Sequence, residues 1–342
     1  MKVLISTPRR APALAPGLAV LGVVLAVVAF LSVTQGSRDI GLGEVLGALG
    51  SWTDDGTTNT TVTLELRVPR TLLGILVGAA LGVAGAILQG VTRNPLADAG
   101  IMGINSGAAV FVVFAITVLG LRGVGVYVWF AFAGAIAALI LVYAVASLGR
   151  EGATPVKLAL AGAAVTAGLG SLTTGIVMTN VDALNELRFW QVGSLAGRYA
   201  PILTGVAPFL IAGLIASLAF GRVLNGLALG EDIARGLGQR VGLTRVAAFG
   251  VVAVLAGAAT AACGPIVFIG LVVPHMARFL CGPDYRWILP YSMLLAPIVL
   301  LLADVIGRVV VPPDELQVGV VLGLLGAPVF IGIVRYGRMS EA

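Results

Sequence analysis

The residues of this chain that could support chemistry are few and scattered. His275 is the only histidine, so imidazoles cannot build a metal cluster, and Cys263 and Cys281 lie within or beside apolar runs, which favours core thiols over a disulfide framework. Neither of the only two lysines, Lys2 and Lys157, follows the glycine of a phosphate-binding loop. No nucleophile lies at a spacing that indicates a partner base. We therefore expect no catalytic residue, no metal site and no bound cofactor in this chain.

Asp304 is the carboxylate that lies deepest within an apolar run, and Arg308 follows it by four residues. Residues four apart share one face of a helix, so these two side chains can form an ion pair. Intramembrane carboxylates also serve in proton relays, but a relay needs more buried charges than this sequence offers. We interpret the pair as structural and place it near one membrane face.

The densest group of charges lies within 225–245, although only 11% of the whole sequence is charged. Gly230 can begin a short helix there, with Glu231 and Asp232 in the first turn, where the positive end of the helix dipole favours them. Arg235 follows Glu231 by four residues and can pair with it. The pattern predicts a short polar helix of unusual charge density.

That short helix also carries an apolar ridge, because Leu229, Ile233 and Leu237 recur every four residues. A helix of this length cannot span lipid, but its ridge suits a groove on another protein. A plain solvated loop is the alternative that the residues alone leave open.

The elements that position these residues are membrane helices. Hydrophobic residues make up 58% of the chain, whereas soluble domains are about half apolar and about a quarter charged. We expect an all-α polytopic membrane protein with about ten transmembrane helices of roughly 20 residues each. The predicted spans are 14–33, 71–90, 101–121, 124–148, 156–179, 201–221, 244–262, 265–281, 287–311 and 318–336. The first is interpreted as a retained span and not as a signal peptide, because it is long and lacks a clear cleavage site.

Charge sets the predicted orientation. With an even number of spans, about twice as many of the 21 lysines and arginines fall on the side of the two termini as on the other. The positive-inside rule then places both termini in the cytoplasm. This topology also explains the net charge of +5 without a nucleic-acid partner. Two helix breaks are predicted, one at Gly264–Pro265 and one at Pro274, and residues 36–60 are expected to form an external polar segment.

Five segments in order resemble the permease subunits of ABC importers for iron–siderophores, haem and vitamin B12, the FecCD family. They are "LRVPRTLLGILVGAALGVAGAILQGVTRNPLA", "FWQVGSLAGR", "LGEDIARGLGQRVG", "GPIVFIGLVVPHMARFL" and "PPDELQVGVVLGLLGAPVF". The resemblance covers about residues 60–338. Gln317 departs from it, since the family usually has proline before Val-Gly, which loosens one turn on the outer face.

The resemblance implies a type II ABC importer permease fold, with residues 1–342 forming a single transmembrane permease domain. It implies two ATP-binding-cassette ATPase subunits, a second permease copy or paralogue, and an extracytoplasmic substrate-binding protein. The partner ATPase would use ATP and Mg, so this chain would not be an enzyme. The expected location is the bacterial cytoplasmic membrane, with lipid as its surroundings.

The resemblance also assigns roles to residues. It implies that a cytoplasmic coupling loop at about 222–243 docks into the ATPase, and that three arginines meet acidic residues of the binding protein. The coupling residues are Gly230, Glu231, Asp232, Ala234, Arg235, Leu237 and Gly238, and the docking arginines are Arg67, Arg70 and Arg308. Arg67 and Arg70 bracket Pro69, and we expect a loop-to-span junction there with both guanidinium groups at the surface. Gln89 and Asn94 are candidates for lining a translocation path, with packing or turn capping as the alternative.

The function indicated is inward transport of a ferric-siderophore or a similar large metal chelate. A haem or cobalamin importer permease is the alternative within the family. An ion-coupled secondary transporter is a less favoured alternative, because the chain has few buried charges.

Overall fold

The computed structural model describes residues 14–53, 56–121, 124–148 and 154–336, and this part of the chain is helical, without strands. Seven of its helices are long and apolar enough to cross a membrane, and three shorter apolar helices complete the set. The ten coincide one to one with the ten predicted spans. The spanning helices are α1 (Leu14–Thr34), α4 (Val68–Thr92), α5 (Ile104–Thr117), α6 (Val124–Ala146), α7 (Pro155–Met178), α9 (Ala200–Leu218), α12 (Val241–Cys263), α13 (Ile269–Cys281), α14 (Tyr285–Val310) and α15 (Val318–Tyr336).

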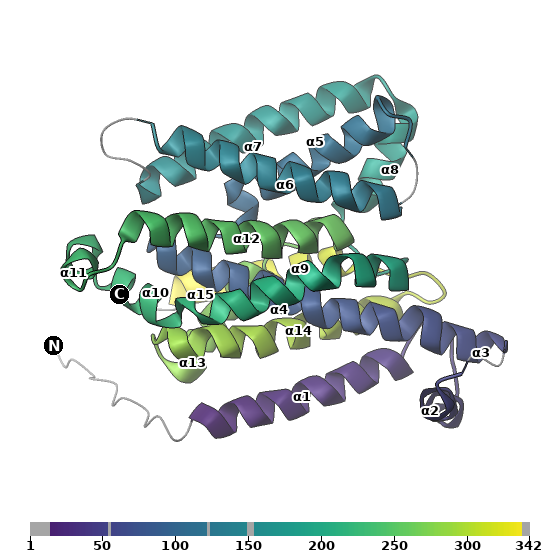
Figure 1. Ribbon diagram of the computed structural model, residues 1–342. Coiled ribbons are helices and arrows are strands. Elements are labelled where there is room, and N and C mark those ends of the chain that lie inside the picture. The colour runs from purple at the N-terminus through teal and green to yellow at the C-terminus, as the bar shows by residue number, and fades with distance from the viewer. Residues whose placement is uncertain (1–13, 54–55, 122–123, 149–153, 337–342) are drawn as a thin grey trace.

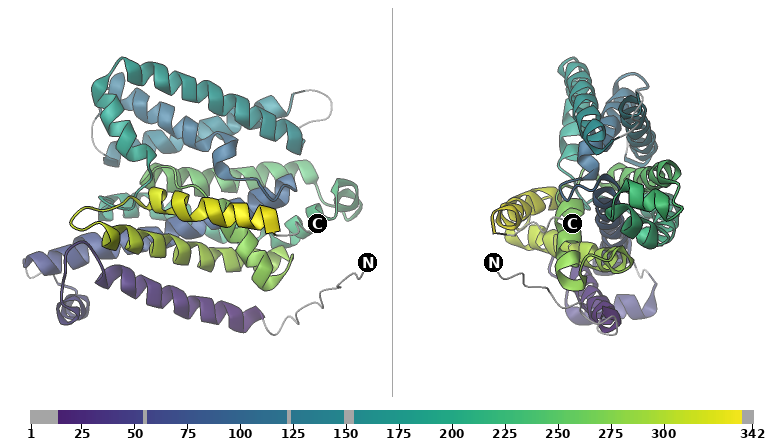
Figure 2. Two further views of the ribbon diagram at one scale, coloured as in Figure 1. Left: turned by 180° about the vertical axis from the view of Figure 1, so that it is seen from behind. Right: turned by 90° about the vertical axis from the view of Figure 1, so that its left-hand side faces the viewer.

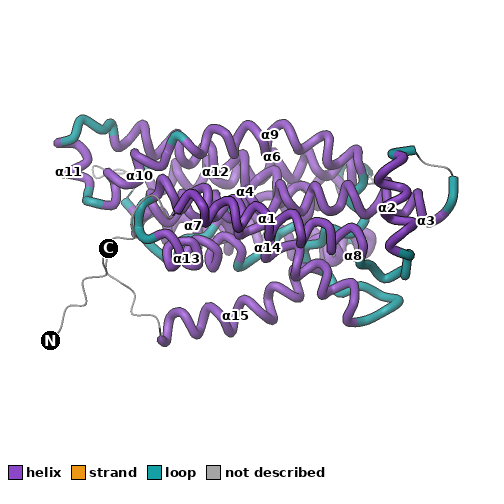
Figure 3. The backbone as a smooth tube through the Cα atoms, turned by 90° about the horizontal axis from the view of Figure 1, so that it is seen from below, coloured by secondary structure: helices purple, strands orange, loops and turns teal. Residues whose placement is uncertain are grey.

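Short helices lie at the two ends of this bundle. They are α2 (Leu42–Ser51), α3 (Thr58–Thr61), the π-helix η2 (Val62–Arg67), α8 (Val181–Gln191), α10 (Phe220–Ala228) and α11 (Glu231–Gly236). The 3₁₀-helix η3 (Ala99–Met102) instead lies within the bundle, packed against α5 and α7. Helices α10 and α11 lie at one end, together with the start of α1 and the end of α15, whereas α2, α3 and α8 lie at the opposite end (Figure 1, Figure 3). Because the number of spans is even, the start of α1 and the end of α15 lie at the same end of the bundle.

Helix α4 occupies the centre of the molecule, packed against α9, α12, α13 and α14. Helix α1 lies on the outside against α14, while α5, α6 and α7 form a separate group beside α12 (Figure 1, Figure 2). Small residues permit the closest approaches within this core. A β-carbon added at Gly85 of α4 would overlap the carbonyl group of Gly270 on α13, and one added at Gly78 would meet Pro297 of α14 at 2.6 Å. Lipid provides little hydrophobic drive between helices, so such contacts stabilise the bundle through van der Waals packing.

The predicted break at Gly264–Pro265 is present. Helix α12 ends at Cys263, and Gly264 has a φ of +73°, which glycine adopts at little cost. The carbonyl left free at Cys263 accepts a hydrogen bond of 2.8 Å from the backbone N–H of Ser194, in the loop after α8. This hydrogen bond connects the α12–α13 connection to the loop that follows α8.

The break predicted at Pro274 and the loop-to-span junction predicted at Pro69 are both absent. Pro274 lies inside α13, where it cannot bond the carbonyl four residues earlier, that of Gly270. The side-chain amide of Gln89 donates to that carbonyl at 3.2 Å and replaces the missing bond.

Pro69 likewise sits inside a continuous helix from Thr58 to Thr92. The π-helical turn η2 precedes it, so that Val68 N–H already bonds the carbonyl of Thr63, five residues back. The π-helical turn thus moves the hydrogen bonds from the carbonyl four residues back to the one five residues back. The helix can therefore continue through Pro69, which has no N–H to donate. No loop-to-span junction exists at this position.

Candidate functional site

One candidate site is the polar helix α11, which lies at the end of the bundle where α1 begins and α15 ends. It begins after Gly230, which has a φ of +111°, and carries Glu231 and Asp232 in its first turn, as predicted. Arg235 pairs with Glu231 at 3.1 Å and with Asp232 at 3.3 Å. The segment predicted as a loop at 222–243 is therefore largely helical, because α10 and α11 occupy most of it.

Glu231 connects α11 to two spanning helices. Its carboxylate accepts a hydrogen bond from Arg245 of α12 and lies 3.8 Å from Arg93, which caps the end of α4. Ala234 is fully buried behind the helix. Glu231 therefore links α11 to the ends of α4 and α12.

Three apolar side chains, one in α11 and one on each side of it, also face outward, beside the exposed Asp232 and Arg235. Leu229, Ile233 and Leu237 are 61%, 53% and 65% exposed. Gly238, with a φ of +81°, ends the ridge with a sharp turn. An apolar ridge projecting beyond the bundle is the feature that a protein partner would cover.

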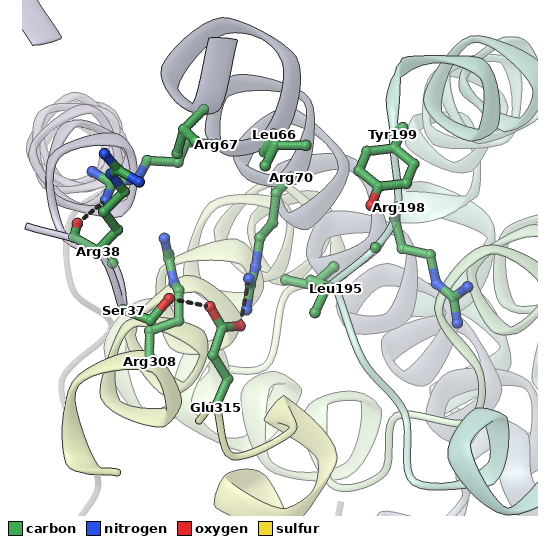
Figure 4. Close-up of a pocket in the computed structure, with 14 residues that line it drawn as sticks. Ser37, Arg38, Leu66, Arg67, Arg70, Leu195, Arg198, Tyr199, Arg308 and Glu315 are labelled. Carbon is green, nitrogen blue, oxygen red and sulfur yellow. Dashed lines mark hydrogen bonds and ion pairs between the residues drawn. The ribbon is translucent and has the colours of Figure 1, made fainter. Parts of the chain in front are cut away.

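The opposite end of the bundle holds a second candidate site, where several arginines gather around Glu315 (Figure 4). Arg70 of α4 makes ion pairs of 2.7 Å with both Asp304 of α14 and Glu315 of the α14–α15 connection. Arg308 also pairs with Asp304, at 3.0 Å. The predicted Asp304–Arg308 pair is thus present, but Asp304 serves two guanidinium groups.

Two of the arginines hold the end of α1. Arg308 donates to the carbonyls of Ser32 and Gln35 at 2.8 Å each, and Arg67 donates to the carbonyl of Thr34 at 2.7 Å. The last carbonyls of a helix lack partners within it and carry partial negative charge. Arg67 and Arg308 therefore cap the carboxyl end of α1.

The expectation that Arg67 and Arg70 project at the surface was wrong. Arg67 is 5% exposed, Arg308 is 2% exposed, and the side chain of Arg70 is 13% exposed. The helix continues through Pro69, the chain after α1 covers Arg67, and Asp304 of α14 and Glu315 cover Arg70. Their role in docking stays a prediction.

The two candidates for a translocation path lie apart. Gln89 is 2% exposed and packs between α4 and α13, where Arg278 donates to its amide oxygen at 2.6 Å. Asn94 is exposed, and its side chain accepts from the N–H of Leu96 at 2.9 Å in a tight turn. Both contacts match the packing and turn-capping alternatives, and a path-lining role stays a prediction.

Two adjoining cavities of about 300 and 330 Å³ flank the Arg70–Glu315 pair, and both are also lined by Arg198. Burial alone would raise the pKa of the Glu315 carboxyl, but the charge and hydrogen bond of Arg70 lower it below its ordinary value. Burial lowers the pKa of Arg198, which an arginine tolerates without losing its charge at neutral pH. Glu315 and Arg198 stood in motifs that carried the family resemblance, and nothing in their spacing indicated a shared site.

The ten apolar helices, with the polar helix α11 at one end and the charged, hollowed opposite end, are those of a multi-pass membrane protein. The FecCD transport family model matches residues 24–336, and the chain belongs to this family. It is accordingly a transport permease subunit and not an enzyme.

Related permeases align with this chain over nearly its whole length. The chain is 46% identical over 321 residues to the ferric enterobactin transport system permease protein FepD of Escherichia coli (strain K12), covering 94% of each chain. It is 42% identical over 314 residues to the probable siderophore transport system permease protein YfiZ of Bacillus subtilis (strain 168), covering 92% of this chain and 94% of that one. A solved structure described as an inward-facing conformation of the metal-chelate type of ABC transporter superposes with a TM-score of 0.82 at 26% identity, over 94% of this chain and 99% of that one.

Proposed function

We propose that this chain is the permease subunit of an ABC importer that carries a ferric-siderophore inward. Its family membership and its similarity to permeases named for enterobactin and siderophore transport support this cargo class. The observation that carries the proposal is α11, an exposed apolar ridge on a chain whose sequence has no phosphate-binding loop. Such a chain must obtain the energy of ATP hydrolysis from a partner.

The proposed assembly has two permease chains, two ATPases and an external binding protein. Helix α11 with Gly230, Glu231, Asp232, Ala234, Arg235, Leu237 and Gly238 would dock the ATPase. The Glu231 contacts to α4 and α12 support a coupling role, because they link that docking point to the helix bundle. This assignment puts both termini in the cytoplasm, in agreement with the distribution of basic residues, and puts α2, α3 and α8 outside.

The test of this function is uptake by the purified transporter in lipid vesicles. We expect entry of a ferric-siderophore to require ATP, the ATPase and the loaded binding protein together. Uptake by the permease chain alone, driven by an ion gradient, would instead identify a secondary transporter.

We expect the double variant Ile233→Asp, Leu237→Asp to lower ATPase association about 10²- to 10⁴-fold, since each of the two side chains contributes about 1.5–3 kcal/mol when a partner buries it. Association is measured by pull-down of the ATPase with the permease in nanodiscs, and ATP-driven uptake should fall in parallel. Membrane insertion should persist, because both side chains are exposed.

The matched control is Leu148→Asp, which changes an exposed leucine two residues after the end of α6. Helix α6 ends on the same side of the bundle as α11 (Figure 1). It should leave ATPase association unchanged. Unchanged association in the double variant would show that the ATPase docks elsewhere.

A further inference from the structure

The larger of the two cavities at the external end, about 330 Å³, is lined by the end of α8, the loop that follows it and the start of the chain leading into α15. We call it the α8 cavity. The residues that matter below are Glu186, Trp190, Arg198, Glu315 and Gln317. Its size is at the lower end of the range for ligand pockets, roughly 300–1,000 Å³.

Three residues that line this cavity carry buried polar atoms without hydrogen-bond partners. Trp190 Nε1, Arg198 Nε and Gln317 Oε1 are all buried, and none has a hydrogen-bond partner within the described part of the chain. The whole Trp190 and Arg198 residues are only 5% and 8% exposed. Buried polar groups are normally paired, because an unmet donor or acceptor costs about 1–3 kcal/mol. Two donors and one acceptor around one cavity indicate a polar ligand.

Arg198 differs from the other buried arginines at this end. Arg67, Arg70 and Arg308 are each held by carboxylates or backbone carbonyls, whereas no hydrogen bond or ion pair of Arg198 occurs within the described residues. Its guanidinium points away from the Arg70–Glu315 pair (Figure 4). A buried cation without a partner is costly unless an anion completes the site.

The carboxylates that face the cavity do not neutralise Arg198. Glu315 is bound by Arg70 and by the hydroxyl of Ser37. Glu186 lies on the exposed face of α8, where water screens its charge. The strongest local attraction for an anion is therefore at Arg198.

We propose that the α8 cavity binds a carboxylate of the incoming chelate, with the terminal N–H groups of the Arg198 guanidinium as its donors and with Trp190 and Gln317 in the wall beside it. The planar guanidinium fork matches the two oxygens of a carboxylate. This inference rests on the proposed import function and makes Arg198 a specificity-determining residue. The carboxylate belongs to the cargo and not to the binding protein, because Arg198 is recessed and the cavity admits a chelate arm but not a protein domain.

The equilibrium test uses the assembled transporter in nanodiscs, labelled with 5-fluorotryptophan. The Trp190 resonance is assigned from the variant Trp190→Phe. We expect citrate to shift this resonance saturably and its neutral triamide to leave it unmoved. Absence of a citrate-dependent shift in the wild-type protein, or an equal shift with the triamide, would overturn the proposal.

Variants separate charge from structure. Arg198→Gln should weaken citrate binding about tenfold, in keeping with the loss of one charge-assisted hydrogen-bonded contact. Arg198→Lys should retain part of the affinity, because it keeps the charge but not the planar fork. Arg188→Gln is the matched control, since Arg188 is an exposed arginine of α8 that does not line the cavity, and it should bind citrate as the wild type does. Equal affinity in Arg198→Gln and the wild type would contradict the assignment.

A kinetic measurement identifies the source of the carboxylate. Arg198→Gln should leave the association rate of the loaded binding protein unchanged. A slowed rate, with citrate binding intact, would show that an acidic side chain of the binding protein enters the cavity and would overturn the cargo assignment. Failure of the import function itself has a different signature, namely no ATP-driven chelate uptake by the wild-type transporter while citrate still shifts Trp190.

Discussion

Replacing Asp304 with leucine is expected to destabilise the protein by about 3–5 kcal/mol, the usual cost of removing one member of a buried ion pair. Asp304 is 1% exposed and pairs with both Arg70 and Arg308. The substitution leaves Arg308 buried without a counterion and removes one of the two carboxylates that bind Arg70. Thermal unfolding in nanodiscs, followed by the loss of folded protein on size-exclusion chromatography, measures the effect.

Two further variants make this prediction specific. Arg308→Met should be milder, because Asp304 keeps Arg70 as a partner. The double variant Asp304→Leu, Arg308→Met should also be milder than Asp304→Leu alone, since Arg70 then retains Glu315 and no unpaired charge is left at position 308. If all three variants stayed fully stable but lost transport equally, the network would have a role in transport and not in the structure.

The second large effect is expected at the crossing of α4 and α13. Gly85→Ala places a methyl group against the backbone of Gly270, which cannot move aside as a flexible side chain would. Overpacking a core typically costs about 1–3 kcal/mol, and we expect the upper end of this range. Separation of the two helices would also lengthen the Gln89 bond to Gly270 that replaces the one lost at Pro274. The readout is again the midpoint of thermal unfolding.

Gly250→Ala is the control for this prediction. Gly250 lies in the spanning helix α12, and a β-carbon there meets nothing within 4 Å. Alanine exceeds glycine in helix propensity by about 1 kcal/mol, so this variant should be neutral or slightly stabilising. Equal unfolding midpoints for the two variants would mean that the close crossing does not contribute to stability.

Whether an ion pair can be predicted from the sequence depends on how far apart its two residues lie along the chain. The Asp304–Arg308 and Glu231–Arg235 pairs follow from a spacing of four on one helix, and both are present. The contact of Arg70 with Asp304 joins positions 234 residues apart, so no local pattern encodes it. From local sequence alone Arg70 therefore resembles a surface residue, whereas the packing of α4 against α14 buries its side chain.

The prolines show the same limit. Gly264 and Pro265 together predict a break correctly, because glycine provides the required positive φ. Pro274 alone does not end α13, since a distant amide, that of Gln89, satisfies the free carbonyl. Proline weakens a helix locally, but tertiary contacts decide whether the helix ends.

The three-way contact among α1, α4 and α14 has a consequence for biogenesis. Helix α1 contains no charged residue and can enter the bilayer alone. Helix α14 carries Asp304 and Arg308, and such groups cost up to about 2.5–3.5 kcal/mol each at the centre of a lone inserting helix. Their partners, Arg70 and the last carbonyls of α1, have already been synthesised when α14 leaves the ribosome. Helix α14 should therefore insert alongside α1 and α4, and its integration into the membrane should depend on their prior arrival.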